Sequence, residues 1–155
     1  MIIRPATVAD VERLADIVVE AGGYDAEWRA RFVEWSRRTI VDADPANVLS
    51  VIEVDGAVAG RLRVVRDAEG LRLAGIQLDP AVRNRGLGTE IVRGLERAAA
   101  RDGVPVLIGV EKDNHGARRL YERLGYRRFG ETEDEFLYHK TVRDLGPGLG
   151  GTCSS

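Results

Sequence analysis

The spacing of apolar residues changes twice along the chain, and each change marks a different kind of secondary structure. After a short apolar start at Ile2–Arg4, apolar residues recur every three or four positions from Thr7 to Gly22 and again from Glu27 to Ile40. This period predicts two helices, each with one apolar face. Thr7 precedes the first helix with Asp10 three residues on, which is a variant of the capping box. The chain therefore begins with a predicted strand and two helices.

The middle of the chain has the composition of strands. The runs "VLSVIEV" and "VAGRLRVV" are rich in β-branched residues and are joined by Asp55-Gly56, a strong hairpin signal. A second turn at Asp67–Gly70 leads to the strand "LRLAGIQL". Pro80 stops this strand, because proline cannot donate to the hydrogen-bond ladder. Three antiparallel strands are expected here.

The helical period returns at Gly86 and ends at Gly103, where the buried strand "VPVLIGV" follows. One more helix ends at Gly125, and two last strands are expected at about Tyr126–Gly130 and Glu135–Lys140. This order predicts an α/β fold with a mixed, mostly antiparallel sheet of about seven strands and about four helices. It excludes a doubly wound parallel sheet.

Composition supports one globular domain. The chain has 155 residues, of which 44% are hydrophobic and 31% charged. We expect residues 1–144 to form the domain and residues 145–155, rich in Gly, Pro and Ser, to form a tail. The net charge of -2 gives no sign of a nucleic-acid or membrane partner.

Neither a metal site nor a membrane segment is expected. The single cysteine, Cys153, cannot form a disulfide within the chain, and the 2 histidines stand apart in the sequence. No apolar run approaches the roughly 18 to 20 residues of a membrane span, and the first residues lack the apolar core of a signal peptide. These observations predict a cytoplasmic protein.

The stretch "VRNRGLGTEIV", Val82 to Val92, has the composition of an anion-binding turn. A helix N-terminus carries unpaired N–H groups and a partial positive charge, and glycine lets a phosphate come close. Gly86 and Gly88 stand at the start of the predicted helix, beside Arg83 and Arg85. The turn lacks the ending of a P-loop and the third glycine of a dinucleotide fingerprint. Alone, it is equally compatible with a phosphate turn and an ordinary helix start.

A second motif further along the chain resolves this ambiguity. "NHGARRLYERLGYRRFGE" begins with Asn114 as an expected N-cap and continues as a helix with one apolar face. It contains the pattern Asn-x-x-Ala-x-x-Leu-Tyr-Glu-x-x-Gly-Tyr, and the earlier turn reads as Arg/Gln-x-x-Gly-x-Gly after the strand "LAGIQLDP". Together these pieces resemble the GNAT superfamily of N-acetyltransferases. The resemblance is strong from about Leu71 to Gly130 and agrees in order before that.

The resemblance implies acetyl-CoA as cosubstrate and no metal. In such proteins the strand before the glycine turn splays from the next strand and leaves a V-shaped cleft for the pantetheine arm. By resemblance, the backbone of Ile76, Gln77, Leu78 and Asp79 lies along that arm, and the Leu78 N–H polarises the thioester carbonyl. The pyrophosphate is expected on the N–H groups of about Arg85 to Thr89. The expected cofactor residues of the turn are Arg83, Asn84, Arg85, Gly86, Leu87, Gly88 and Thr89.

The helix after this turn supplies the other expected site residues. Asn114 is expected to hydrogen-bond the pantetheine arm, and Arg118 is a weaker candidate for the phosphates. Tyr121 matches the family's general acid, which donates to the departing CoA thiolate. Its spacing alone also fits a core tyrosine on an amphipathic helix. No general base is assigned: the strand before the turn carries no carboxylate, while Glu111 and Asp113 read as solvated turn residues.

The acceptor end is less defined. By analogy with the family, the two N-terminal helices and the last strands form the walls of the acceptor pocket. Tyr24, Trp28, Phe32 and Trp35 recur at helical spacing, which indicates core packing or an aromatic wall for the substrate. The nearby acidic residues Glu20, Asp25 and Glu27, and the run "GETEDEF", would suit a cationic amine. The aromatic residues also fit ordinary core packing of a helix, and the acidic run also fits a solvated turn between strands.

The sequence therefore favours an acetyl-CoA-dependent N-acetyltransferase that acts on an amine by direct attack in a ternary complex. The alternative is a noncatalytic acyl-CoA-binding or sensor domain on the same fold. A nucleotide-binding regulatory domain is disfavoured, because the phosphate motifs for it are absent. The resemblance also allows a homodimer through the last strands.

Overall fold

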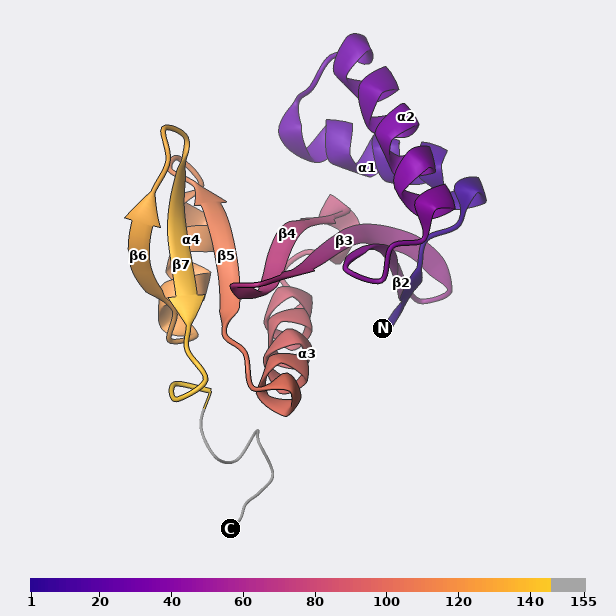
Figure 1. Cartoon of the computed structure of the whole chain (residues 1–155). Helices are drawn as coiled ribbons and strands as arrows, with labels where there is room; N and C mark the ends of the chain where they lie inside the picture. The colour runs from indigo at the N-terminus through magenta and orange to yellow at the C-terminus, as the bar shows by residue number, and fades with distance from the viewer. Residues whose placement is uncertain (146–155) are drawn as a thin grey trace. The chain divides into compact units, whose positions relative to one another are not determined.

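The computed structural model describes residues 1–145 (Figure 1). Its strands are β1 (Ile2–Pro5), β2 (Asn47–Val54), β3 (Ala57–Asp67), β4 (Gly70–Leu78), β5 (Val106–Glu111), β6 (Arg127–Glu131) and β7 (Glu135–Lys140). Its helices are α1 (Val11–Gly22), α2 (Ala26–Asp42), α3 (Leu87–Asp102) and α4 (His115–Arg123). Short 3₁₀ turns lie at Val8–Asp10 and Pro80–Val82.

The strands follow the order β1-β2-β3-β4-β5-β7-β6 in a 7-stranded sheet. Strands β4 and β5 pair in parallel, with Leu71 opposite Val106, whereas β1–β2, β2–β3, β5–β7 and β6–β7 pair antiparallel. This confirms the predicted mixed, mostly antiparallel sheet and the predicted order of elements. The parallel pair arises because α3 connects β4 to β5, and such a crossover returns the chain in the same direction.

The chain packs as two compact units, and β3 and β4 each run through both. The first unit comprises Met1–Val65 and Ala74–Arg85, and the second comprises Arg66–Leu73 and, among the described residues, 86–145. Each unit is described by itself below.

In the first unit, α1 and α2 cover one face of the sheet formed with β2 and β3 (Figure 1). Its core consists of Ala6, Val11, Leu14, Ala15, Val18, Phe32, Val33, Leu49 and Val51. The helical and strand periods bring these side chains to a common layer, and their burial is the main stabilising term.

The start of the first helix differs in detail from the sequence prediction. The capping box between Thr7 and Asp10 is present, but the first turn, Val8–Asp10, is 3₁₀ and α1 begins at Val11. The tighter turn removes Val8 from the apolar face of the helix, and its side chain is 47% exposed.

In the second unit, α4 lies against the β5, β7 and β6 strands (Figure 1). The hydroxyl of Tyr138 on β7 donates to Glu122 on α4, at 2.7 Å. Leu145, where the tail was expected to begin, is 3% exposed and donates its N–H to the Thr141 carbonyl at 3.0 Å. Cys153 and the rest of the predicted tail lie outside the described residues. No helix within residues 1–145 is long and apolar enough to cross a membrane.

Candidate functional site

The glycine turn leads into α3, and no side chain caps the backbone N–H groups of the first turn of this helix. Gly86 is the N-cap with φ 76°, a left-handed conformation that glycine adopts without strain. The Gly86 carbonyl accepts the first helical hydrogen bond, from Glu90 N–H at 3.1 Å. The N–H groups before Glu90 have no partners inside the helix, because every α-helix leaves its first donors unpaired. They are available to an anion.

Gly88 has no conformational or packing reason to be glycine. Its φ is not positive, and it lies inside the first turn of α3. A Cβ at this position would meet Leu120 Cδ2 at 3.7 Å, which is an ordinary contact. The residue therefore leaves room at the very point where the unpaired N–H groups are exposed.

On α4, Asn114 is the predicted N-cap. Its Oδ1 accepts a hydrogen bond from Ala117 N–H at 3.1 Å, which leaves its amide NH₂ as the side chain's donor. Arg118 donates from Nη1 to the Lys112 carbonyl at 3.1 Å and lies over the Phe136 ring at 4.6 Å. Its Nε is buried and has no partner within residues 1–145.

Tyr121 lies on the buried face of α4. The residue is 5% exposed, and its ring meets that of Tyr126 edge-on at 6.0 Å between centroids. Burial raises the pKa of Tyr121 to about 12, because the charged phenolate would lose its hydration. The hydroxyl makes no hydrogen bond to another described residue of its unit. Tyr121 is therefore a neutral donor at all ordinary pH values.

In the first unit, the strand segment Ile76–Asp79 ends at a tightly held turn. The Asp79 N–H donates to the Ala59 carbonyl at 2.8 Å, so this N–H already belongs to the sheet. The Asp79 carboxylate accepts from Ala81 N–H at 2.9 Å and from Arg13 at 2.6 Å. These two hydrogen bonds lower the pKa of Asp79. The carboxylate thus fixes the path of the chain out of β4.

The three residues before Gly86 are exposed and differ in their contacts. Arg83 Nε donates to the Leu78 carbonyl at 3.1 Å, and Arg85 lies 3.4 Å from the Asp55 carboxylate. Asn84 has φ 62°, a left-handed conformation that asparagine tolerates better than most residues. The turn is shaped by its own backbone and keeps two positive side chains at the surface.

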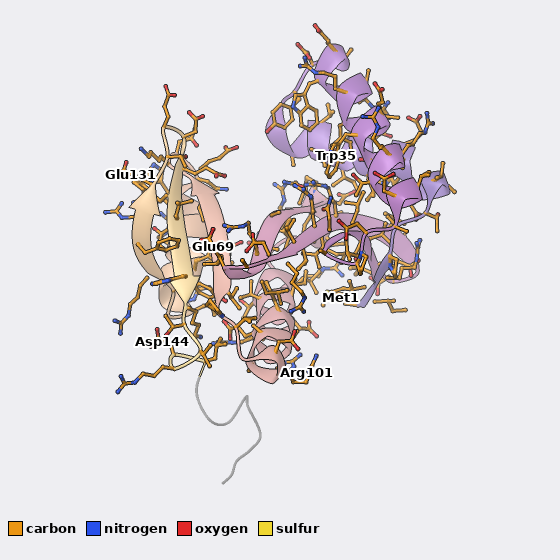
Figure 2. The ribbon with its side chains drawn as sticks, in the orientation of Figure 1. Met1, Trp35, Glu69, Arg101, Glu131 and Asp144 are labelled. Atoms are coloured by element: carbon orange, nitrogen blue, oxygen red, sulfur yellow. The ribbon has the colours of Figure 1, made fainter. Side chains whose placement is uncertain are left out.

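The aromatic residues near the N-terminus divide between the core and a pocket. Tyr24, which precedes α2, stacks on Trp28 with 3.9 Å between ring centroids, while Phe32 is 7% exposed and belongs to the core. Figure 2 shows Trp35 on the side of α2 that faces β3. A cavity of about 280 Å³ lies in this unit. Its lining residues are Trp28, Arg31, Phe32, Trp35, Arg61 and Arg63.

Sequence reasoning missed the two arginines of this pocket. Arg61 and Arg63 alternate with Leu62 on β3, so both side chains lie on the face that α2 covers. The signal was present as two charged residues two positions apart in an otherwise apolar strand. The acidic residues near α2 are not among the lining residues of the pocket. The Asp25 carboxylate caps α2 at Trp28 N–H, 2.8 Å away, and Glu27 pairs with Arg31 at 3.8 Å. Among the described residues, no group of His, Cys, Asp and Glu could hold a metal ion.

Comparison with known proteins places this arrangement in a family. Residues 12–126 match the sequence profile of the acetyltransferase (GNAT) family. Mycothiol acetyltransferase of Actinosynnema mirum is 38% identical over 79 residues, 50% of this chain and 27% of that protein. N-acetylaspartate synthetase of Danio rerio is 34% identical over 86 residues, 55% of this chain and 30% of that protein. The chain thus aligns with less than a third of either relative.

A solved structure agrees over almost the whole chain. The PaiA N-acetyltransferase of Thermoplasma acidophilum, solved in complex with coenzyme A, superposes with a TM-score of 0.76 at 17% identity. The match covers 90% of this chain and 98% of that one, and at this identity it establishes the fold. Since the family profile covers most of the sequence and the fold agrees, the chain belongs to the acetyltransferase (GNAT) family.

Proposed function

We propose that this protein transfers the acetyl group of acetyl-CoA to a primary amine by direct attack in a ternary complex. The amine nitrogen attacks the thioester carbonyl carbon and the carbon–sulfur bond breaks. CoA leaves as a thiolate, and the new amide nitrogen loses a proton. Both a donor for the thiolate and an acceptor for that proton are needed. Family membership supports the donor substrate, and the contacts within each unit support the roles below.

The start of α3 is the observation that carries the proposal. Its unpaired N–H groups and dipole suit a pyrophosphate, and Gly86 supplies the left-handed cap. Gly88 adds the specific support, since neither its φ nor its packing requires glycine. A group that approaches the backbone from outside would require it. We assign the CoA pyrophosphate to the N–H groups of Leu87, Gly88 and Thr89, with Arg83 and Arg85 as nearby charge.

Tyr121 is proposed as the hydrogen-bond donor to the leaving sulfur. With a pKa of about 12, it keeps its proton throughout the working range. Complete transfer to a thiolate with an ordinary pKa of about 8.5 would be uphill by about 5 kcal/mol. A shared hydrogen bond that strengthens as charge develops on sulfur avoids this cost. Tyr121 therefore stabilises the departing thiolate as a hydrogen-bond donor, without complete transfer of its proton.

The remaining assignments follow the resemblance. We propose that the Leu78 N–H polarises the thioester carbonyl and that the backbone of Ile76 and Gln77 contacts the pantetheine arm. Asp79 contributes through its carbonyl only, because its N–H is held by Ala59. The Asn114 amide NH₂ is proposed to donate to the arm. Arg118 is the weaker phosphate candidate, since Lys112 and Phe136 already position its guanidinium.

The test is an acetyl-transfer assay that detects free CoA thiol. Purified protein and acetyl-CoA are incubated with a panel of primary amines, and thiol release is compared with release in the absence of amine. We expect release that depends on one class of amine, with an equal amount of N-acetylated product by mass spectrometry. Thermal denaturation with CoA and with ATP serves as the binding control. CoA should raise the melting temperature, whereas ATP should have a much smaller effect.

A noncatalytic acyl-CoA-binding domain is the second candidate, and one observation favours it. Strand β4 carries no carboxylate that could act as general base. In the proposed enzyme, the proton instead goes to water or the amine arrives deprotonated, so the rate should rise with pH. Stabilisation by CoA without thiol release for any amine would support the noncatalytic candidate. Absence of both would exclude the two together.

A further inference from the structure

The cavity between α2 and β3 is lined by Trp28, Arg31, Phe32, Trp35, Arg61 and Arg63. We call it the arginine–aromatic pocket. Arg31 pairs with Glu27 at 3.8 Å, whereas Arg61 and Arg63 form no salt bridge with a carboxylate of the described first unit. The guanidinium of Arg61 lies over the rings of Phe32 and Trp35, at 5.2 and 5.9 Å from their centroids. That of Arg63 lies over Trp35 at 4.8 Å. The rings of Phe32 and Trp35, the aromatic floor of the pocket, thus hold two cations close together.

The polar partners of these two cations are neutral. Arg61 Nη1 donates to Gln77 Oε1 at 2.6 Å, and Arg63 Nε donates to Asn47 Oδ1 at 3.0 Å. No carboxylate of the described first unit forms a salt bridge with either residue. Arg61 is only 8% exposed, and its Nε is buried with no partner within residues 1–145. Buried charges in proteins are normally paired, and an anion in this pocket would provide such a pair for Arg61.

The pKa shifts of Arg61 and Arg63 also indicate that their charges are poorly compensated. Burial lowers the pKa of Arg61 to about 10, and the positive charge of Arg63 acts in the same direction. Burial also lowers the pKa of Arg63. Both groups remain charged at neutral pH, at a cost that an anionic ligand would relieve.

The neighbouring strand leaves space for the Arg61 side chain. A Cβ at Gly75 on β4 would lie 2.5 Å from Arg61 Nη1, and the φ of Gly75 is not positive. The backbone there could therefore accept another residue, and a side chain at this position would compete for space only with the present placement of the guanidinium. Two strands are thus matched to hold a cation that the first unit leaves without a counter-ion.

We propose that the arginine–aromatic pocket binds an anionic group, a carboxylate or a phosphate, of a small amine acceptor. Two guanidinium groups offer the fork of donors that suits such an anion, and the ring faces offer a flat apolar surface. A cavity of about 280 Å³ suits a molecule of amino-acid size. The identity of this ligand as the acetyl acceptor rests on the proposed function. The proposal differs from the cationic amine that the acidic residues of the sequence would suit.

The chain contains its own reporter for this pocket. It has 2 tryptophans, Trp28 and Trp35, and both line the cavity. Intrinsic tryptophan fluorescence therefore follows binding without CoA and without turnover. Three matched pairs form the ligand panel: tyrosine and tyramine, glutamate and its dimethyl ester, phosphoethanolamine and ethanolamine. Putrescine represents the cationic class. We expect saturable fluorescence changes for the anionic members and at least tenfold weaker binding for their partners and for putrescine.

Variants then assign the effect to the arginines. Arg63→Gln and Arg31→Gln should each weaken binding of the preferred anionic amine, Arg63→Gln by at least tenfold. Arg38→Gln is the matched control, because Arg38 lies on the exposed face of α2 with 72% of its side chain exposed. It should bind as the wild type does. Arg63 and Arg31 are preferred to the buried Arg61, whose substitution could prevent folding, and circular dichroism checks each variant.

The possible results separate this inference from the proposed function. Tighter binding of carboxylates than of phosphoethanolamine would identify the anion as a carboxylate, and the reverse order as a phosphate. Binding of anionic amines with no thiol release from acetyl-CoA would support the pocket and overturn the acetyltransferase proposal. Preference for putrescine or for the partners that lack the anionic group would overturn the pocket. Unchanged affinity in the folded Arg63→Gln variant would overturn it as well.

Discussion

The hydroxyl of Tyr126 donates a 2.9 Å hydrogen bond to the carboxylate of Glu96, whose side chain has no exposed surface. The same carboxylate lies 2.8 Å from Arg93 and 3.3 Å from Lys140 Nζ, and Lys140 is itself buried. Glu96 on α3 thereby links this helix to β7 and to the segment after α4. The burial of Tyr126 and the nearby Glu96 charge raise the pKa of Tyr126, so its hydroxyl stays a donor.

Glu96→Gln should destabilise the second unit strongly. The variant keeps the shape of the side chain but leaves the buried Lys140 ammonium without its anion, and loss of one partner of a buried pair costs about 3 kcal/mol. Urea denaturation followed by circular dichroism measures the change. Glu133→Gln, at an exposed position near the last turn, should change stability by less than about 0.5 kcal/mol. Equal stability of the two variants would contradict a structural role for the network.

Gly88→Ala should weaken CoA binding without harming the fold. The added Cβ fits against Leu120 at 3.7 Å, and alanine is at least as good a helix former as glycine. Isothermal titration should give a Kd for CoA at least tenfold higher, while the melting temperature of the free protein stays equal or rises. Gly94→Ala, in the interior of the same helix, should stabilise by up to about 1 kcal/mol and keep the wild-type Kd. A wild-type Kd in Gly88→Ala would remove this glycine from the pyrophosphate site.

Tyr121→Phe should lower kcat and leave acetyl-CoA affinity nearly intact. The hydroxyl is proposed to act on the leaving sulfur, and a positioned acid is worth about a hundredfold or more in rate. Steady-state kinetics with thiol detection measure kcat, and titration measures binding. Because burial raises the pKa of Tyr121 to about 12, kcat should show no decline caused by this group below about pH 11. Tyr138→Phe, which removes another buried hydroxyl of the same unit, should lose stability and retain kcat. Wild-type turnover in Tyr121→Phe would exclude it from the mechanism.

The N-terminal capping box predicts a stability difference that depends on pH. The hydrogen bond from Arg4 lowers the pKa of Asp10 from 3.8 to about 2, with further help from Thr7. This corresponds to about 2 kcal/mol, which solvent screening of the partly exposed Arg4 reduces towards 1 kcal/mol. Because the folded pKa is depressed, the stabilisation is complete above pH 3.8 and is lost as the pH falls through 2.

Asp10→Asn tests this pH dependence of the stability. It should be less stable than the wild type at pH 7, and the gap should close as the pH falls from about 4 to about 2. Urea denaturation at several pH values gives both curves. Asp42→Asn, at an exposed position at the end of α2, should follow the wild-type curve at every pH. A gap that stays constant down to pH 2 would mean that the Asp10 charge does not contribute.

The elements and their order could be predicted because they depend on local pattern. Apolar periods, the Asp55-Gly56 hairpin and the N-cap at Asn114 are each encoded within a few residues, and the structure contains all three. The glycine turn could be identified only together with the second motif. Gly88 shows why, because neither its conformation nor its packing within the chain requires glycine, and only a bound group would require it.

The arginine–aromatic pocket could not be predicted from local pattern. Its lining comes from α2 and β3, and their contact depends on the register that places Arg63 opposite Leu49 on β2. Asp25 also shows why acidic residues are hard to interpret from sequence: a carboxylate at a helix start can accept from backbone N–H groups, as Asp25 does from Trp28. Charge counted along the sequence does not show which charged side chains line a cavity.

Gly75→Ala should impair the arginine–aromatic pocket through Arg61. The new Cβ would lie 2.5 Å from Nη1 and 3.2 Å from Cζ, so the guanidinium must shift from its place over Phe32 and Trp35. Binding of the preferred anionic amine, followed by tryptophan fluorescence, should weaken at least tenfold, because a cation that faces the ligand is displaced. Gly130→Ala in β6 adds a Cβ at an ordinary 3.7 Å from Leu137 and should bind normally. If Gly75→Ala folds and binds the anionic amine with wild-type affinity, Arg61 does not contact the ligand, and the anion site must rest on Arg63 and Arg31 alone.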